Sequence, residues 1–165
     1  MSTTTKKREN MEINIGISEA HRKDIADALS KVLADSYMLY LKTHNYHWNV
    51  TGELFHSLHE QFEQQYTELA DAIDEIAERI RALGYRAPGT FKEFQDLTSI
   101  SEEQEEPEAL KMVRKLALGN EQVLRTARQA LEPAKEAEDE ATVDLLTQRL
   151  HVHSKTAWML RSHLE

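Results

Sequence analysis

Apolar residues recur at steps of three and four positions along most of the chain, which is the pattern of an amphipathic α-helix. The most regular run covers about residues 54–83, and three others cover about 18–49, 107–131 and 135–163. Glycine and proline fall mainly between these runs, and Pro107 is placed to open the third helix. We therefore expect four long helices, separated by short turns and one longer connection.

Helices of about 25 to 30 residues are about 40 Å long, and four of them in one domain indicate a four-helix bundle. A tight turn at Gly52 makes the first two helices antiparallel, and Pro133 is expected to separate the last two. The connection over residues 84–107 can cross the whole bundle, and its segment TFKEFQDL (residues 90–97) has apolar residues at every third position behind a threonine cap. The predicted fold class is all-α: a ferritin-like four-helix bundle with a short extra helix in the long crossover between helices 2 and 3.

Composition narrows the function classes. The 165 residues suffice for a single domain, which we assign to residues 17–165 behind a flexible polar tail, residues 1–16. The net charge of -9 argues against nucleic-acid binding by the main body of the protein, because such binding needs a basic surface. The lack of cysteine excludes disulfides and metal sites with thiolate ligands. Because the chain shows neither a signal-peptide pattern nor an apolar membrane span, we expect a soluble, cytoplasmic protein without a membrane partner.

The stretch HNYHWNVTGELFHSLHEQFE (residues 44–63) holds four of the eight histidines. His47 ends the first predicted helix, and His59 lies just across the turn in the second, so these two are candidate metal ligands. His44 and His56 are expected at supporting or surface positions. Since imidazole and carboxylate groups suit Fe(II), with zinc and manganese as competitors, iron is the first candidate metal.

Carboxylates with chelating spacing accompany these histidines on the second predicted helix. His59 and Glu63 are four residues apart and share a face, as do Asp74 and Glu78. The two pairs lie about 16 Å apart along the helix, too far for one ion within one chain. Two copies of the helix packed antiparallel about a two-fold axis would bring them together, with His47 adding a second imidazole. The spacing therefore predicts a metal site that requires a dimer.

A metal site inside one bundle is not expected. Such a site needs a Glu followed three residues later by His on two different helices, and the chain has only Glu53 with His56. His153 lies on an apolar stripe, where a hydrogen-bonded core histidine is expected. Trp48 and Tyr66 have packing as their default role. A helical bundle without metal chemistry, serving as an interaction module, is the plainest alternative, but it leaves the matched ligand spacing to chance.

The run H-W-N-V-T-G-x-x-F-x-x-L-H, from His47 to His59, is followed by D-E-I-A-E-R, which starts at Asp74. Together they resemble the signature of the Dps miniferritins, the DNA-binding proteins from starved cells. The resemblance extends over nearly the whole chain, from the first helix to the AWML of the last. It implies a hollow shell of twelve four-helix subunits, a homododecamer with two-fold and three-fold interfaces. It also implies a di-iron ferroxidase centre between two-fold-related subunits.

Transferred by position, the resemblance implies that His47 and His59 bind iron in one subunit and that Asp74 and Glu78 bind it from the partner. Glu63 stands where the family usually has Asp, so its reach toward the second iron is one methylene longer. The implied activity is that of a ferroxidase, an oxidoreductase that oxidises Fe(II) to Fe(III), preferably with hydrogen peroxide, and stores ferric mineral. Iron binding should weaken at low pH, because protonated imidazole cannot bind a metal.

Two further positions match the family. Trp48 corresponds to a tryptophan beside the centre that is thought to take up oxidising equivalents. Asp144 corresponds to an acid that lines the pore through which iron enters.

DNA binding is the alternative activity that the resemblance implies. Lys6, Lys7 and Arg8 form a basic segment in the tail, with Glu9 and Glu12 beside it. If these residues contact DNA, binding should be weak and sensitive to salt. The main role would then be compaction of nucleoid DNA, and the protein would be nucleoid-associated.

Overall fold

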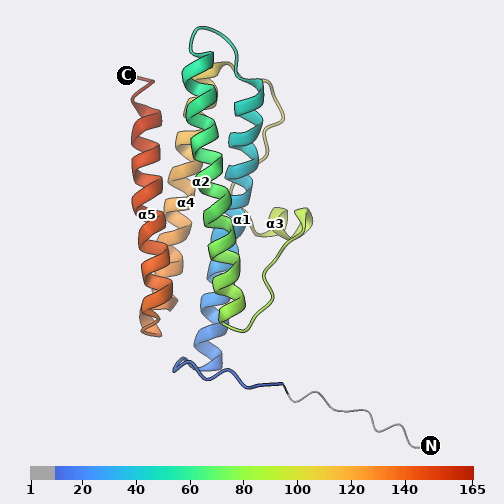
Figure 1. Cartoon of the computed structure of the whole chain (residues 1–165), viewed down its shortest axis with the longest axis vertical. Coiled ribbons are helices and arrows are strands. Elements are labelled where there is room, and N and C mark those ends of the chain that lie inside the picture. Colours follow the sequence, from blue (N-terminus) through green and yellow to red (C-terminus); the bar gives the residue numbers. More distant parts are fainter. Residues whose placement is uncertain (1–9) are drawn as a thin grey trace, which may run out of the picture.

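The computed structural model describes residues 10–165 and forms, over that range, an all-helical bundle without strands (Figure 1). Its helices are α1 (Glu19–Asn49), α2 (Phe55–Ala82), α3 (Phe91–Leu97), α4 (Ala109–Glu136) and α5 (Glu140–Arg161). The predicted all-α class and the short extra helix are confirmed. The candidate DNA-contacting residues Lys6, Lys7 and Arg8 lie outside the described residues. Within residues 10–165, each helix is too short or too polar to cross a membrane.

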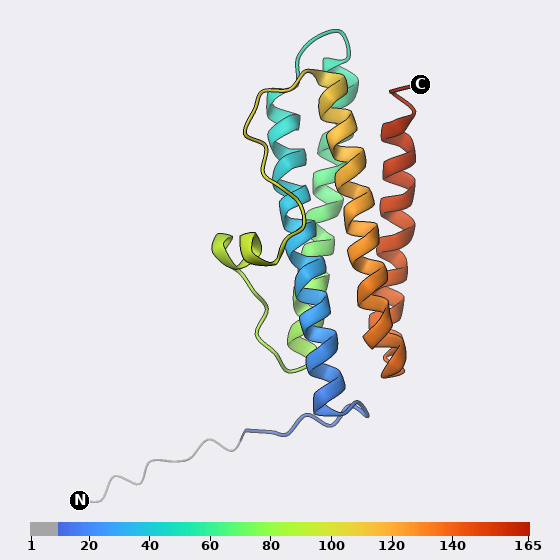
Figure 2. The same ribbon diagram turned by 180° about the vertical axis from the view of Figure 1, so that it is seen from behind.

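The four long helices form two antiparallel hairpins, α1 with α2 and α4 with α5, which pack together through α1 and α4. The crossover leaves the end of α2 and runs the length of the bundle to the start of α4, with α3 against α1 (Figure 2). On the remaining side, α2 and α5 make few contacts with each other. The bundle is therefore tightly closed on three sides and more open on the fourth.

The boundary between the last two helices differs from the prediction. Pro133 lies inside the last turn of α4, and Pro107 precedes that helix, whose N-cap is Glu108. The chain reverses instead at Glu138, which has a left-handed φ of 53°. The Asp139 amide then donates to the carbonyl of Ala134 at 2.9 Å. Left-handed backbone with such a bond is an ordinary helix terminator, so conformation at residue 138 and not the proline ends α4.

Gly119 permits close packing of α4 against α1 and does not interrupt its helix. It is buried, and a Cβ atom at this position would lie 2.7 Å from Cδ1 of Leu39. Leu39 is fully buried, in the apolar cluster that also contains Phe62 and Leu116. Gly119 is therefore a contact point between α4 and α1.

Asp35, a fully buried carboxylate in α1, anchors the crossover. Its Oδ1 accepts hydrogen bonds from the Thr98 hydroxyl at 2.7 Å and from the Ser99 amide at 2.6 Å. Its Oδ2 accepts from the Thr126 hydroxyl of α4 at 2.6 Å. One side chain thus joins α1, α4 and the segment after α3, in keeping with the rule that a buried charge needs several partners.

Candidate metal centre

His47 and His59 face each other across the turn between α1 and α2. Their ring centroids are 3.8 Å apart and their planes differ by 16°. Nδ1 of each ring lies 2.8 Å from the backbone carbonyl oxygen of the other residue. Because a carbonyl can only accept, both Nδ1 atoms carry the proton and donate. In the neutral rings each Nε2 then keeps its lone pair, which is the form of imidazole that binds metal.

The turn that creates this pair follows from local backbone chemistry. The α1 helix ends at Asn49, and its C-cap Val50 has an extended backbone whose amide donates to the Tyr46 carbonyl at 2.9 Å. Gly52 has a φ of +100°, a conformation that side chains disfavour. The Phe55 amide then bonds to the Gly52 carbonyl at 3.0 Å and leads into α2. This turn brings His47 and His59, twelve positions apart in the chain, close enough for their reciprocal hydrogen bonds.

Aromatic neighbours hold the pair of imidazoles on two sides. Phe55 stacks on His59 with centroids 5.1 Å apart, and Tyr66 meets His47 edge-on at 5.1 Å. His47 is 7% exposed and His59 is half-buried. Their orientation is thus set by packing as well as by the reciprocal hydrogen bonds, as a ligand pair requires.

His44 lies in a stack of aromatic rings beside the site. Trp48 covers it with centroids 3.8 Å apart, and Tyr66 lies 4.2 Å away. Burial, together with the nearby ring of His47, lowers the pKa of His44. Trp48 itself is 61% exposed, so its indole covers His44 on one side and leaves much of its surface open. The sequence predicted a supporting or surface position for His44, but the spacing of apolar residues gave no sign of the ring stack.

The candidate carboxylates lie farther along α2. Glu63, Asp74 and Glu78 are all exposed. Glu63 lies one turn beyond His59, and its charge adds to burial in raising the pKa of Tyr66. Within residues 10–165 of one chain, no three His, Asp or Glu side chains are grouped so that they could hold a metal ion. The structure thus brings His47 and His59 together, but within one chain it does not group Glu63, Asp74 or Glu78 with them as a metal site.

Asp144 lies on α5, exposed, and accepts a hydrogen bond from Gln148 at 2.8 Å. It lines an open groove of about 500 Å³ between α2 and α5, together with Glu75 and Glu78. The groove therefore includes one candidate metal ligand and the candidate pore residue.

His153 is a core histidine with satisfied hydrogen bonds, as its position on the apolar face predicted. Its Nδ1 donates to Oδ1 of Asn120 at 2.8 Å, and its Nε2 accepts from Nη2 of Arg149 at 3.2 Å. Burial, aided by the Arg149 charge, lowers the pKa of His153 to about 3. Both Arg149 Nη atoms also donate to the Glu68 carboxylate. The spacing of apolar residues indicated His153 itself but none of its partners Asn120, Arg149 and Glu68.

The ferritin-like domain model matches residues 26–165. A relative called DNA protection during starvation protein 2, from Bacillus anthracis, is 42% identical over 142 residues, which cover 86% of this chain and 97% of the relative. The solved structure of Dps from Vibrio cholerae is 33% identical, with a TM-score of 0.89, over 95% of this chain and 99% of that one. It is described as a member of a superfamily of ferritin-like diiron-carboxylate proteins.

Dps from Bacillus brevis is similar to the same degree, with 35% identity and a TM-score of 0.85 over 88% of this chain and 98% of that one. Sequence and fold therefore agree along almost the entire length of these proteins. The chain belongs to the Dps family of ferritin-like proteins.

Proposed function

We propose that this protein is an iron-storing miniferritin that oxidises Fe(II) at di-iron sites shared between two subunits. The observation that carries the proposal is the reciprocal bonding of His47 and His59. Each ring uses Nδ1 to hold the other residue's backbone, with Nδ1 and carbonyl oxygen 2.8 Å apart, which leaves two neighbouring Nε2 atoms as ligands. Two imidazoles and one carboxylate form a ligand set typical of non-haem Fe(II) sites.

Asp74 and Glu78 are the carboxylates that we assign to this site, from a second subunit. Asp74 follows His59 by fifteen residues on α2, or about 22 Å along the helix, so the two cannot bind the same ion within one chain. An antiparallel two-fold pairing places the acids of one α2 beside the histidines of the other. Glu63, one turn from His59, is available to a second iron in the same site.

The chemistry follows from the ligand types. Fe(II) is the substrate, neutral imidazoles hold it, and the carboxylates offset the additional charge of the Fe(III) product. Hydrogen peroxide needs two electrons and two protons to become two water molecules. Two Fe(II) ions in one site supply both electrons together, so no one-electron step releases hydroxyl radical. We assign peroxide as the preferred oxidant for this reason, and a dodecameric shell as the store for ferric product.

Protection of DNA is the cellular role that fits this chemistry. The relative from Bacillus anthracis carries that role in its name, and removal of Fe(II) and peroxide together removes the source of hydroxyl radical. Direct contact with DNA through Lys6, Lys7 and Arg8 is a second proposal, supported by their charge. Trp48, which stacks beside the histidines, is assigned as a side chain that absorbs stray oxidising equivalents, and Asp144 as a residue of the iron-entry path.

Titration of anaerobic Fe(II)-loaded protein with hydrogen peroxide tests the function. We expect consumption of two Fe(II) for each peroxide and no spin-trapped hydroxyl radical, because both electrons come from one site. Oxygen, supplied at the same concentration, should oxidise the iron more slowly. Absorbance of Fe(III) and radical trapping give the two readouts. A yield of trapped hydroxyl radical equal to that of Fe(II) and peroxide in buffer alone would contradict the proposal, because it would show that the two electrons leave one at a time.

A further inference from the structure

A row of tyrosine rings leads away from the histidine pair along α1. Tyr66 of α2 meets His47 edge-on, with ring centroids 5.1 Å apart. Tyr40 of α1 lies 6.1 Å from Tyr66, and Tyr37 follows at 5.9 Å from Tyr40. These spacings are those of aromatic rings in contact. Tyr66, Tyr40 and Tyr37 therefore form one tyrosine path, which begins beside a proposed iron ligand and covers about 15 Å of α1.

The tyrosine path ends beneath the short helix α3. Phe94 stacks on Tyr37 with centroids 4.7 Å apart, and Phe91 lies 6.5 Å from the same ring. A phenyl ring is much harder to oxidise than a phenol, because it has no hydroxyl group to release a proton as the electron leaves. Tyr37 is therefore the last side chain on the path that can hold an electron vacancy.

The hydroxyl groups of Tyr37, Tyr40 and Tyr66 can release a proton to solvent. Each side chain is half-buried, and its hydroxyl has no hydrogen-bond partner in residues 10–165. None of the three oxygens is among the buried polar atoms that lack a partner, so each reaches solvent. The hydroxyls of Tyr46 and Tyr85, by contrast, donate within the protein. The tyrosines with accessible protons are thus the ones in ring contact with each other.

Trp48 is not a step on the tyrosine path. Its indole contacts His44, with centroids 3.8 Å apart, and is 61% exposed. In the described part of the chain, this indole makes no ring contact with His47 or with a tyrosine. An electron vacancy that arises beside His47 therefore reaches Tyr66 directly, and reaches Trp48 only across the imidazole of His44.

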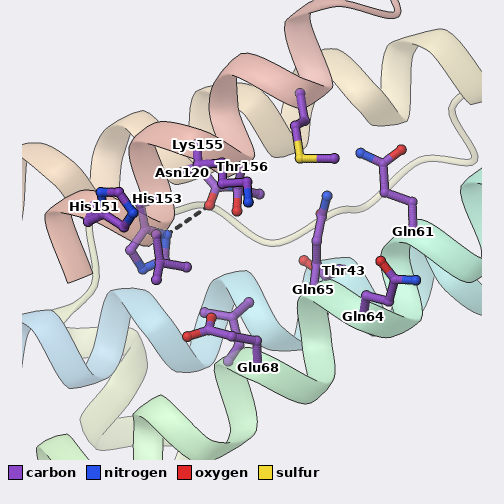
Figure 3. A pocket seen from close by; sticks show the side chains of 13 residues that line it. Thr43, Gln61, Gln64, Gln65, Glu68, Asn120, His151, His153, Lys155 and Thr156 are labelled. Atoms are coloured by element: carbon purple, nitrogen blue, oxygen red, sulfur yellow. Dashed lines mark hydrogen bonds between the residues drawn. The ribbon is translucent and has the colours of Figure 1, made fainter. Parts of the chain in front are cut away.

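The face of α2 toward α5 offers no comparable route. A cavity of about 320 Å³ lies there (Figure 3). Among the residues that the structure describes, its lining includes aliphatic, amide, charged and imidazole side chains but no tyrosine, tryptophan or phenylalanine. Aromatic side chains therefore lead from the histidine pair toward α1 and α3, and not across this cavity to α5.

We infer that the tyrosine path is an electron relay, which supplies the second electron when peroxide meets a site that holds a single Fe(II). The inference rests on the proposed function, since Fe(II) and peroxide are its reactants. A site with two Fe(II) does not need the relay, because both electrons come from iron. With one Fe(II), the relay replaces the one-electron cleavage of peroxide that releases hydroxyl radical.

The electrons and protons of this step balance. Peroxide takes two electrons and two protons to become two water molecules. Fe(II) supplies one electron and becomes Fe(III), Tyr66 supplies the other together with its phenolic proton, and solvent supplies the second proton. Tyr66 is left as a neutral radical. Tyr40 then passes an electron to Tyr66 and releases its proton to solvent, while Tyr66 takes a proton back.

The same exchange between Tyr37 and Tyr40 moves the vacancy to the end of the path. There it is filled by an electron from a second Fe(II), which becomes Fe(III), and by one proton from solvent. Two Fe(II) are then consumed for each peroxide, as in a site that holds both ions from the start. The relay thus lets the two iron ions arrive one after the other.

Spin-trap labelling followed by mass spectrometry tests the relay. Full-length protein is mixed with peroxide and a nitroso spin trap, which adds to tyrosyl radicals and marks each oxidised residue. At one Fe(II) per site, we expect adducts at Tyr37 and Tyr66. At two Fe(II) per site, we expect both adducts to be lost, because iron supplies both electrons.

Tyr40→Phe distinguishes a relay from a radical that diffuses through solvent. It keeps the ring but removes the oxidisable hydroxyl from the middle of the path. We expect loss of the Tyr37 adduct, with the Tyr66 adduct retained. Tyr66→Phe should lose both adducts and raise the yield of trapped hydroxyl radical at one Fe(II) per site. Each variant removes a hydroxyl that has no partner within residues 10–165, so melting temperatures should be unchanged.

Tyr85→Phe is the matched control, because the Tyr85 hydroxyl donates to the Glu19 carbonyl at 3.1 Å, away from the path. It should leave both adducts unchanged. A Tyr37 adduct that survives in Tyr40→Phe would overturn the relay, as would rapid iron oxidation at one Fe(II) per site without a tyrosyl adduct. Absence of rapid oxidation at two Fe(II) per site would contradict the proposed function, and the relay with it.

Discussion

Replacement of both His47 and His59 by alanine is expected to abolish rapid oxidation of Fe(II) by peroxide. Without the two Nε2 ligands, the carboxylates of the partner hold the metal alone, and the oxidation rate should fall by at least about a hundredfold. Stopped-flow absorbance of Fe(III) measures the rate. Circular dichroism and native mass show whether the fold and the assembly are retained, which we expect because the substitutions lie at the ends of two long helices.

His56→Ala is the control for this experiment. His56 lies three residues from His59 on the same helix, but its side chain is 83% exposed and lies 3.4 Å from Glu60. The variant should oxidise iron at the rate of the unchanged protein. An unchanged rate in the double variant, with the fold intact, would remove the histidine pair from the proposed mechanism.

Asp35→Ala is expected to be the most destabilising single substitution that we consider. It leaves the hydroxyls of Thr98 and Thr126 and the amide of Ser99 without their shared acceptor in a buried place. We expect a loss of about 3 to 5 kcal/mol in the free energy of unfolding. Denaturant unfolding measures the loss, and amide hydrogen exchange at Ser99 reports whether the crossover detaches.

Asp27→Ala serves as the comparison, because Asp27 is on the same helix but exposed, where it pairs with Lys23 at 2.5 Å. Exposed pairs contribute about 0 to 1 kcal/mol. Thr126→Val, which removes one of the three bonds, should give an intermediate loss. Equal losses for the Asp35 and Asp27 variants would show that the buried carboxylate does not anchor the crossover.

Periodicity predicted the bundle well because each long helix has a continuous apolar face, and a helix of that kind is recognisable without its neighbours. The short helix α3 was predicted from its threonine cap and regular apolar spacing, and the Thr90 hydroxyl does accept from the Glu93 amide at 3.2 Å. The end of α4 was predicted wrongly because proline is a local signal. The left-handed conformation at Glu138 depends on how α4 and α5 meet, and a glutamate at this position does not indicate it.

The site could be predicted in part for a similar reason. The spacing of His47 and His59 around a turn pointed to a pair of ligands, and the structure places their rings 3.8 Å apart. The reciprocal hydrogen bonds that orient them depend on backbone carbonyls, which every residue has. Polar groups such as Asp35, whose partner Thr126 is 91 positions away, are also invisible to periodicity, because an isolated acid in a helix resembles a surface residue.

The central claim is that each iron site draws its ligands from two subunits, and complementation tests it most directly. One variant lacks His47 and His59, and a second lacks Asp74 and Glu78, so each should be inactive alone. When the two are co-expressed in equal amounts and purified as mixed assemblies, half of the two-fold pairs are mixed, and each mixed pair has one intact site. We predict recovery of about a quarter of the original ferroxidase activity. No recovery in verified mixed assemblies would contradict a shared site, because ligands confined to one chain cannot be restored by its partner.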